Sequence, residues 1–336
     1  EFRGRMLEWA RSSDEAKRQV QQRRLGIENG LKVWRNQLNS LMDPQQMGRK
    51  IDSENALKNA VMADPKLAEV YGDAWQGAER AVANYRQFYK HYQFIESNRG
   101  FGGSLFRHAK TLVRGTAEIE KPNEKRLRAY RDTALPRVEQ RLFSTAPIDS
   151  GYEQLSLAFT LDKLLEWLGP DDEIVRTVLG KEGPLTLAER LVSETRLGDP
   201  AFRKKLWEGG AEAVKKSNDP MIVLARTIEP WAMDLRKRYD DEVEAPLDQA
   251  LEKIAKARFA VLGKSVYPDA TFTLRVTYGA VEGWTEGDRK VEPFTRIGRA
   301  FERETGEDPF VMPASWHAAK EKLDLDTYYN FAATTD

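Results

Sequence analysis

The sequence predicts a mainly α-helical fold, in which a multi-helix domain is followed by a small and incomplete β portion. Over roughly the first four-fifths of the chain, apolar residues recur at steps of three and four, the spacing of one helix face. After Gly263 the segment Thr271 to Tyr278 instead alternates polar and apolar residues, as half-buried strands do. We therefore expect a helical domain at residues 1–262 and the start of a sheet at residues 263–336.

The N-terminal helices are predicted from apolar stripes and from the residues that interrupt them. The first stripe consists of Ile27, Leu31, Trp34, Leu38 and Leu41. Asp43-Pro44 ends that helix, and a second one follows through Val61. Asp64-Pro65 has the pattern of an N-cap followed by proline in the first turn, and the helix that it begins is expected to end near Arg99.

Further helices are expected after a glycine-rich break at residues 100–103 and after a series of proline dipeptides. These dipeptides are Lys121-Pro122, Ala146-Pro147, Gly169-Pro170, Asp199-Pro200, Asp219-Pro220 and Glu229-Pro230. Asp199 and Asp219 repeat the capping pattern of Asp64. No fixed-period repeat is present, so a solenoid is not favoured.

The β portion of the sequence is too small to form a stable sheet by itself. Val281 to Trp284 is a candidate partner strand, Glu286 to Asp288 a turn, and Thr327 to Thr335 a further extended stretch. A short helix is expected from Arg296 to Glu304. Because one strand or one pair of strands does not make a stable sheet, we expect the missing strands in sequence outside this chain.

Composition and motifs exclude several classes of function. Lysine plus arginine and aspartate plus glutamate both number 53, so no basic excess indicates a nucleic-acid partner. No apolar run is long enough for a membrane span, and the absence of cysteine excludes disulfides and thiolate chemistry. No zinc-protease, nucleophile-elbow or phosphate-loop motif is present, so neither a metal nor a cofactor is expected.

The remaining polar candidates are interpreted as structural. His91, His108 and His317 are expected to have ordinary surface or packing roles. Ser104 is expected to be a helix N-cap rather than a nucleophile. The adjacent acidic pairs Asp171-Asp172 and Asp240-Asp241 would point apart on a helix, so they are expected to be caps or solvated side chains.

Several ordered segments resemble one bacterial family, the dipeptidyl-peptidase 7 and dipeptidyl-peptidase 11 family (serine peptidase family 46). The segments are Asp219-Pro220-Met221-Ile222, residues 254–263 (IAKARFAVLG), residues 267–275 (YPDATFTLR), Tyr278-Gly279, Pro309-Phe310, Pro313, Trp316, Asn330-Phe331 and residues 334–336 (TTD). Residues 26–41 (GIENGLKVWRNQLNSL) are similar more loosely. The resemblance implies a chymotrypsin-like double barrel with a large helical insertion over its active-site cleft. It makes residues 1–262 the α-helical cap domain and residues 263–336 part of the C-terminal β-barrel. It also implies that all three members of the catalytic triad lie outside this chain.

The resemblance assigns one functional residue to this chain. Family members hold the free α-ammonium of the substrate with an asparagine on a cap helix, and the matching position here is Asn29. The family pattern Asn-Asn-Ala-Leu-Lys is replaced by Glu28-Asn29-Gly30-Leu31-Lys32. The alternative is a solvent-facing asparagine, which is mildly unfavourable in a helix.

Two classes of function follow. In the first, the chain belongs to a serine exopeptidase that releases dipeptides from oligopeptides, in the periplasm or cell envelope. Its expected partners are the oligopeptide substrate, the remaining barrel segments and, as the resemblance suggests, a second copy in a homodimer. In the second, the chain is a non-catalytic helical scaffold or adaptor for a protein partner. An uncovered amphipathic strand at 271–278 would argue against this second class.

Overall fold

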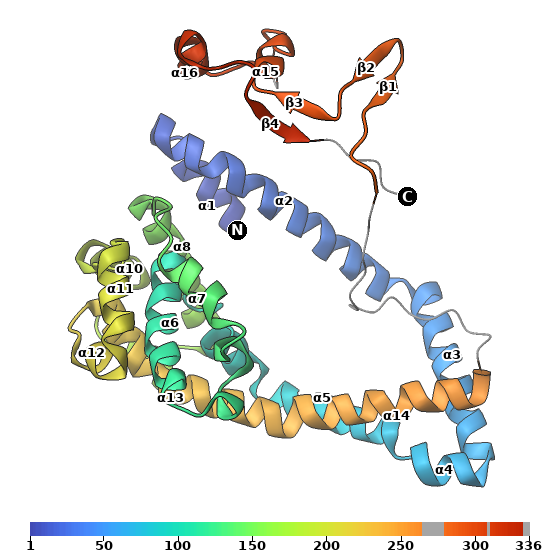
Figure 1. The fold of residues 1–336 in the computed structure, drawn as a ribbon. Helices are drawn as coiled ribbons and strands as arrows, with labels where there is room; N and C mark the ends of the chain where they lie inside the picture. The colour runs from blue at the N-terminus through green and yellow to red at the C-terminus, as the bar shows by residue number, and fades with distance from the viewer. Residues whose placement is uncertain (264–278, 308–309, 332–336) are drawn as a thin grey trace. The chain divides into compact units, whose positions relative to one another are not determined.

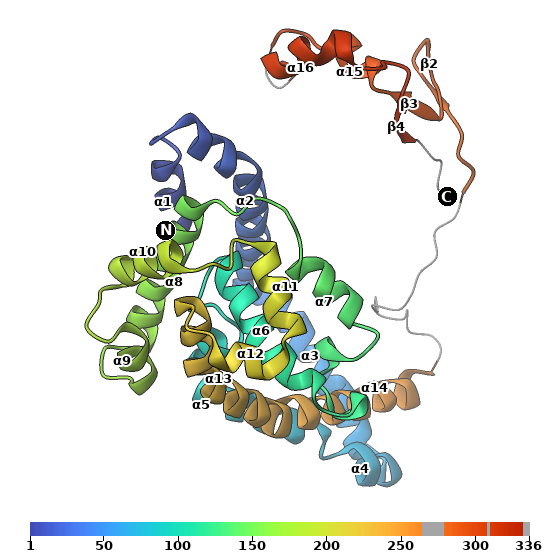
Figure 2. The ribbon, with the colours of Figure 1, turned by 60° about the vertical axis from the view of Figure 1, so that its left-hand side comes forward.

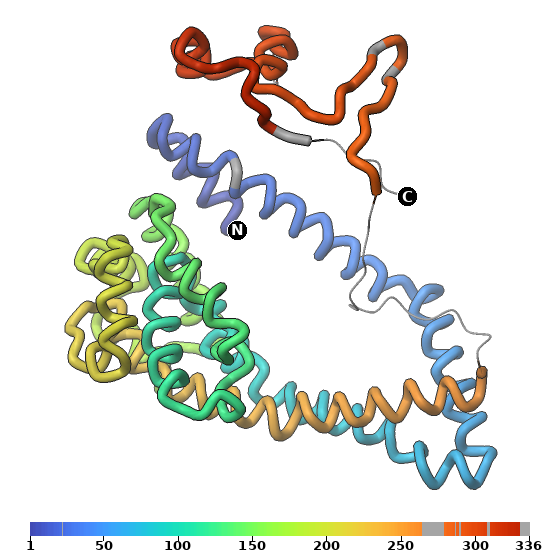
Figure 3. The backbone as a smooth tube through the Cα atoms, viewed as in Figure 1, coloured from blue at the N-terminus to red at the C-terminus, as the bar shows by residue number. Residues whose placement is uncertain are grey.

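A computed structural model of the chain describes residues 1–263, 279–307 and 310–331. The chain divides into two compact units, Glu1–Val266 and Tyr267–Asp336. The predicted strand at residues 271–278 lies outside the described residues. Figure 1 shows the helices of the first unit and the short strands of the second, and Figure 3 traces the same backbone as a tube.

The first half of the helical unit is built from capped helices. Its helices are α1 (Phe2–Trp9), α2 (Asp14–Met42), α3 (Pro44–Ala63), α4 (Pro65–Tyr71), α5 (Ala74–His91), the π-helix η1 (Tyr92–Glu96) and α6 (Ser104–Ile119). Asp43 ends α2 and its carboxylate also caps α3, accepting hydrogen bonds from the backbone N–H groups of Gln45 and Gln46. Asp64 caps α4 in the same way, as its sequence pattern predicts.

The second half repeats this pattern. Two 3₁₀ turns, η2 (Asn123–Lys125) and η3 (Arg128–Tyr130), lead to α7 (Leu135–Leu142), α8 (Ser150–Leu168), α9 (Glu173–Leu179), α10 (Pro184–Glu194), α11 (Pro200–Glu208), α12 (Gly210–Lys216), α13 (Pro220–Tyr239), the π-helix η4 (Asp240–Glu244) and α14 (Ala245–Leu262). The carboxylates of Asp199 and Asp219 accept hydrogen bonds from the first backbone N–H groups of α11 and α13. The capping predictions at both residues are therefore confirmed.

Two of the predicted helix boundaries are wrong. The helix after Asp64 does not continue unbroken to Arg99, because α4 ends at Tyr71, with Gly72 as its C-cap residue, and α5 begins at Ala74. Conversely, Pro230 does not end a helix but lies inside α13. Ile228 and Ala232, on either side of it, are both buried, so core packing holds the helix together across the missing hydrogen bond.

The main hydrophobic core forms around α6, α8 and α13. Helices α11, α12 and α13 all contact α6, and Figure 2 shows them gathered beside it. Phe106 and Leu112 of α6, Leu161 of α8 and Ile222 of α13 are almost completely buried in this core. A smaller cluster around Trp75 lies among α3, α5 and α14. These two clusters position the polar groups described below.

The C-terminal unit contains two antiparallel strand pairs. Strand β1 (Trp284–Glu286) pairs with β2 (Arg289–Val291), and β3 (Phe294–Arg296) pairs with β4 (Tyr328–Phe331). The predicted turn is present, with Gly287 at a φ of 60° as a two-residue hairpin loop favours. Between β3 and β4 lie α15 (Gly298–Glu302), α16 (Ala314–Ala319) and the 3₁₀ turn η6 (Lys320–Lys322). The predicted fold class, mainly helical with a partial sheet, is confirmed.

One strand prediction in this unit is shifted. Residues 281–283 are not a strand, and β1 begins at Trp284 and pairs with β2. The short hairpin loop brings residues 289–291 directly back beside 284–286, and this local geometry sets the pairing. The predicted extended stretch from Thr327 is present as β4, and its last residues lie outside the described part of the chain.

Candidate functional site

Helix α2 carries the residue that the sequence singles out for substrate binding. Its first turn is capped by Ser13, whose hydroxyl oxygen accepts a hydrogen bond from the Ala16 N–H at 3.1 Å. Val20 is buried, and the Arg23 guanidinium stacks 4.1 Å from the centre of the Tyr152 ring of α8. The N-terminal half of α2 is therefore anchored on the helical core.

Asn29 follows this anchored half and is exposed. Its side chain makes no hydrogen bond with any residue that the structure describes, so its amide oxygen is available to a ligand. The neighbouring Glu28 accepts hydrogen bonds from Arg24 at 2.8 Å and Arg3 at 3.2 Å. The Arg24 hydrogen bond holds the pKa of Glu28 below its usual value, and the charge of this carboxylate is balanced by the two guanidinium groups.

The apolar stripe of α2 is also exposed. Leu31, Trp34, Leu38 and Leu41 have exposed fractions of 40%, 64%, 55% and 66%. These positions lie on the face opposite Asn29, given the rotation of about 100° per residue in an α-helix. Within the described residues this part of α2 thus presents a polar face with Asn29 and an uncovered apolar face.

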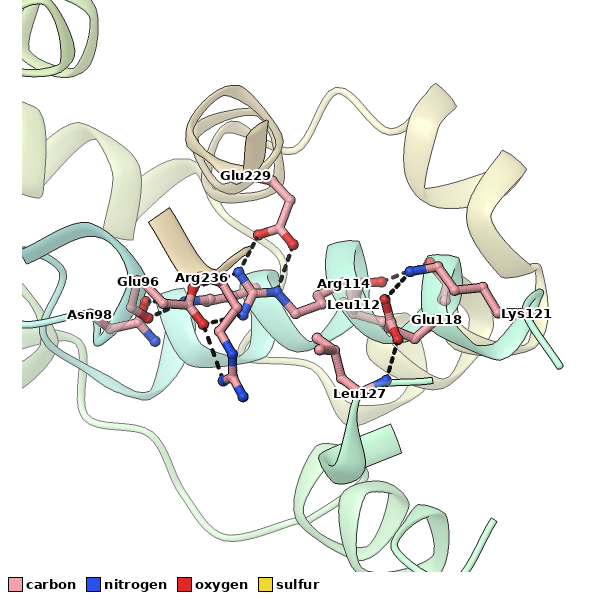
Figure 4. A network of polar contacts seen from close by, with 11 residues as sticks. Glu96, Asn98, Leu112, Arg114, Glu118, Lys121, Leu127, Glu229 and Arg236 are labelled. Atoms are coloured by element: carbon pink, nitrogen blue, oxygen red, sulfur yellow. Dashed lines mark hydrogen bonds and ion pairs between the residues drawn. The ribbon is translucent and has the colours of Figure 1, made fainter. Parts of the chain in front are cut away.

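A buried network of charged side chains lies between η1, α6 and α13 (Figure 4). Arg114 donates two hydrogen bonds of 2.7 Å to the Glu96 carboxylate and bonds of 2.6 and 3.1 Å to Glu229. The Lys110 ammonium donates to the Glu96 carbonyl oxygen at 2.5 Å, to its carboxylate at 3.1 Å and to Asn98 at 2.8 Å. The network therefore ties three helical segments together.

The protonation states in this network follow from the balance of burial and pairing. Burial alone raises the pKa of Glu96, but hydrogen bonds from Arg114 and the charge of Lys110 outweigh it and leave that pKa below its usual value. Burial, with the charge of Arg114, lowers the pKa of Lys110 to about 8. Lys110 remains mostly protonated at neutral pH, as its three acceptors require.

Comparison with known proteins identifies the family. A model of the family described as peptidase S46 matches residues 1–336. The chain belongs to the peptidase S46 family. This membership supports a peptidase over the scaffold or adaptor that the sequence alone leaves open.

Curated relatives of this S46 chain are named as peptidases. It is 28% identical over 219 residues to the Asp/Glu-specific dipeptidyl-peptidase of Shewanella putrefaciens, covering 62% of this chain and 29% of that protein. It is 31% identical over 149 residues to the Asp/Glu-specific dipeptidyl-peptidase of Flavobacterium psychrophilum, covering 43% of this chain and 20% of the other. The matches therefore involve less than a third of each relative.

Solved structures of Porphyromonas endodontalis DPP11 have the same fold. The structure of its complex with the dipeptide Arg-Glu matches 99% of this S46 chain with a TM-score of 0.55 and 16% identity. Another structure of DPP11 matches with a TM-score of 0.53 and the same identity. The chain spans about half the length of these structures, 49% in both cases.

Other polar residues of the S46 chain have structural contacts. His91 Nε2 lies 2.7 Å from Asp172, and His317 Nε2 lies 2.9 Å from Glu304. Asp172 also caps α9, as expected for that acidic pair. Asp240 and Asp241 each pair with a basic residue one turn earlier on their helix.

The expectation that Ser104 caps a helix is wrong. Gly103 occupies the N-cap position of α6, at a φ of 107° that disfavours residues with a side chain. The carboxylate of Glu153, from α8, supplies the cap by accepting hydrogen bonds of 2.9 Å from the N–H groups of Ser104 and Leu105. Because Glu153 is 49 residues from Ser104 along the chain, no local sequence pattern predicts this cap.

His108 should make the stability of the S46 chain sensitive to acid. Burial and the charges of Arg203 and Arg107 lower its pKa to about 4 from the usual 6.5. Between these values the unfolded chain binds a proton that the folded chain does not, so the free energy of unfolding falls as the pH falls. The expected contribution is up to about 1.4 kcal/mol per pH unit.

Urea unfolding at a series of pH values from about 7 to about 4 measures this effect. The variant His108→Gln should show a shallower loss of stability than the unmodified protein over that range. His317→Gln, which changes an exposed histidine, serves as the control and should keep the original slope. Parallel curves for all three proteins would refute the assignment to His108.

Proposed function

We propose that the protein is a serine exopeptidase that releases dipeptides from the free N-terminus of oligopeptides, and that α2 binds the substrate's α-ammonium group. Membership of the peptidase S46 family and the relatives named as dipeptidyl-peptidases support the activity. The observation that carries the role of this chain is the exposed amide of Asn29 on an anchored helix, which forms no hydrogen bond within the described residues.

The chemistry of Asn29 suits an ammonium group. An ammonium has three donors and no acceptor, and the amide oxygen of asparagine is an acceptor with two lone pairs. The hydrogen bond would therefore be charge-assisted, and stronger than one between neutral groups.

The helical cap and the barrel would have different roles in the reaction. By family resemblance, the triad belongs to barrel segments outside this chain, where serine attack and an oxyanion site would carry out acyl transfer. A receptor that holds the N-terminus at a fixed distance from the catalytic serine would restrict cleavage to the bond after the second residue. Binding energy at that remote end would orient the scissile bond. The exposed stripe that includes Trp34 and Leu38 would be the face of α2 that packs on the rest of the protein.

Asn29→Ala in the complete enzyme is expected to lower kcat/KM for free-amine dipeptidyl substrates by about ten- to a hundredfold. This range corresponds to the loss of one hydrogen bond to a charged group. Initial rates with a chromogenic dipeptidyl substrate measure it. Asn36→Ala is the matched control, because Asn36 is exposed two turns further along the same face of α2. Equal kcat/KM values for both variants and the unmodified enzyme would rule out the assigned role.

A further inference from the structure

Two cavities adjoin along one side of α6. One has a volume of about 690 Å³ and the other about 490 Å³. Both are lined by Arg107, Thr111, Ala129 and Tyr130, so the two cavities share a wall and form one groove. We call it the α6 groove. It lies between α6 and the segment of residues 127–148 within the helical unit.

The α6 groove is rich in cationic groups that have no anionic partner. Arg107, Arg128 and Arg141 line it and are exposed, and none of them forms an ion pair with any residue that the structure describes. Among the described lining residues the one carboxylate is that of Glu96, which is already bound by Lys110 and Arg114. The arginines therefore leave an uncompensated positive potential in a concave surface, where fields are focused.

The rest of the groove offers neutral donors and an apolar wall. Burial raises the pKa of Tyr130 to about 12, so its hydroxyl stays protonated and can donate a hydrogen bond at neutral pH. Ser104 contributes a second hydroxyl, and Val138 and Ile148 are among the apolar lining residues. Guanidinium groups, hydroxyl donors and aliphatic side chains together match a ligand that carries carboxylates on a partly apolar backbone.

We propose that the α6 groove binds an acidic peptide segment. Cavities of 690 and 490 Å³ are in the range that accommodates an organic ligand, so a run of several residues would fill the groove better than one inorganic ion. A single-stranded nucleic acid fits less well, because such ligands stack on exposed aromatic rings. Tyr130 is the tyrosine among the lining residues, so the groove offers little surface for stacking. This proposal goes beyond the proposed peptidase function and does not depend on Asn29.

Fluorescence anisotropy with a blocked peptide tests the proposal in the complete protein. The probe is an N-acetylated, fluorescein-labelled peptide of about eight residues in which glutamate alternates with serine. The reference peptide has glutamine at each glutamate position and carries the same label. The glutamate peptide should bind about tenfold more tightly, and the difference should shrink at high salt because exposed charges are screened.

The variant Arg107→Gln/Arg128→Gln/Arg141→Gln is expected to weaken binding of the glutamate peptide about tenfold or more. The control removes the same charge from exposed arginines that do not line the groove, Arg49→Gln/Arg86→Gln/Arg176→Gln, and should change binding less than about twofold. Thermal unfolding of both variants checks that they fold.

Equal affinity for the glutamate and glutamine peptides, or equal losses in the two triple variants, would overturn the proposal. A blocked N-terminus has no ammonium group, so binding of the probe should be independent of Asn29. If Asn29→Ala abolished binding, the probe would sit at the proposed ammonium receptor and the groove would not be its site. If Asn29→Ala left hydrolysis intact, the peptidase role of α2 would fail while the groove proposal stood.

Discussion

Replacing Arg114 with leucine is expected to lower the free energy of unfolding by about 3–5 kcal/mol, the range for breaking a buried ion pair by removing one partner. The Arg114 side chain is 7% exposed and bonds to two carboxylates, Glu96 and Glu229. Leucine would leave Glu229 without the cation that neutralises it in the described part of the chain. Urea unfolding followed by circular dichroism gives the change in free energy.

A neighbouring arginine of the same helix provides the control. Arg107, seven residues earlier on α6, is exposed and unpaired within the described residues, so Arg107→Leu should cost less than about 1 kcal/mol. Arg114→Leu combined with Glu229→Gln should recover part of the loss, because the stranded charge is then removed. If Arg114→Leu and Arg107→Leu lower the free energy of unfolding by the same small amount, the network does not hold η1, α6 and α13 together.

The features that the sequence predicts correctly are local. Asp64, Asp199 and Asp219 each precede a proline, and each caps the helix that follows, because the capping side chain and the N–H groups it accepts from are two or three residues apart. The hairpin turn at Gly287 is predicted for the same reason. Such contacts depend on neighbours along the chain and need no knowledge of the tertiary fold.

The features that the sequence does not predict join distant segments. Arg114 is 18 residues from Glu96 and 115 residues from Glu229, and no spacing rule links them. The continuity of α13 across Pro230 likewise depends on core packing, which overrides the local preference of proline to end a helix. The buried network was therefore visible only once the helices were placed.

The candidate site lies between these two cases. Asn29 is identified through a family resemblance in residues 26–41, and its exposure and its lack of hydrogen bonds to the described residues come from the structure alone. The sequence also carries a signal for the α6 groove. The segment of residues 126–141 contains five arginines and two acidic residues, so it carries a local basic excess. In a chain with zero net charge, that excess is easily overlooked.

Replacing Arg203 with methionine is expected to cost about 3–5 kcal/mol of stability, although Arg203 forms no ion pair within the described residues. Its guanidinium is almost completely buried and donates to the carbonyl oxygens of Leu142 and Ser144, both at 2.6 Å, and of Leu197 and Gly198, at 2.5 and 3.1 Å. Methionine would fill much of the volume but donate nothing. Each buried carbonyl left without a donor costs about 1–3 kcal/mol.

Arg203→Lys separates the geometry of this contact from its charge. Lysine keeps the positive charge, but its compact ammonium cannot reach the carbonyl oxygens at the end of α7 and those just before α11 at the same time. Most of the loss in the free energy of unfolding should therefore remain. Lys205→Met, at an exposed position of the same helix, should change the free energy of unfolding by less than about 0.5 kcal/mol. Full stability in Arg203→Lys would show that charge alone is sufficient. A large loss in lysine and methionine variants alike would show that the planar fork of arginine joins the end of α7 to the start of α11.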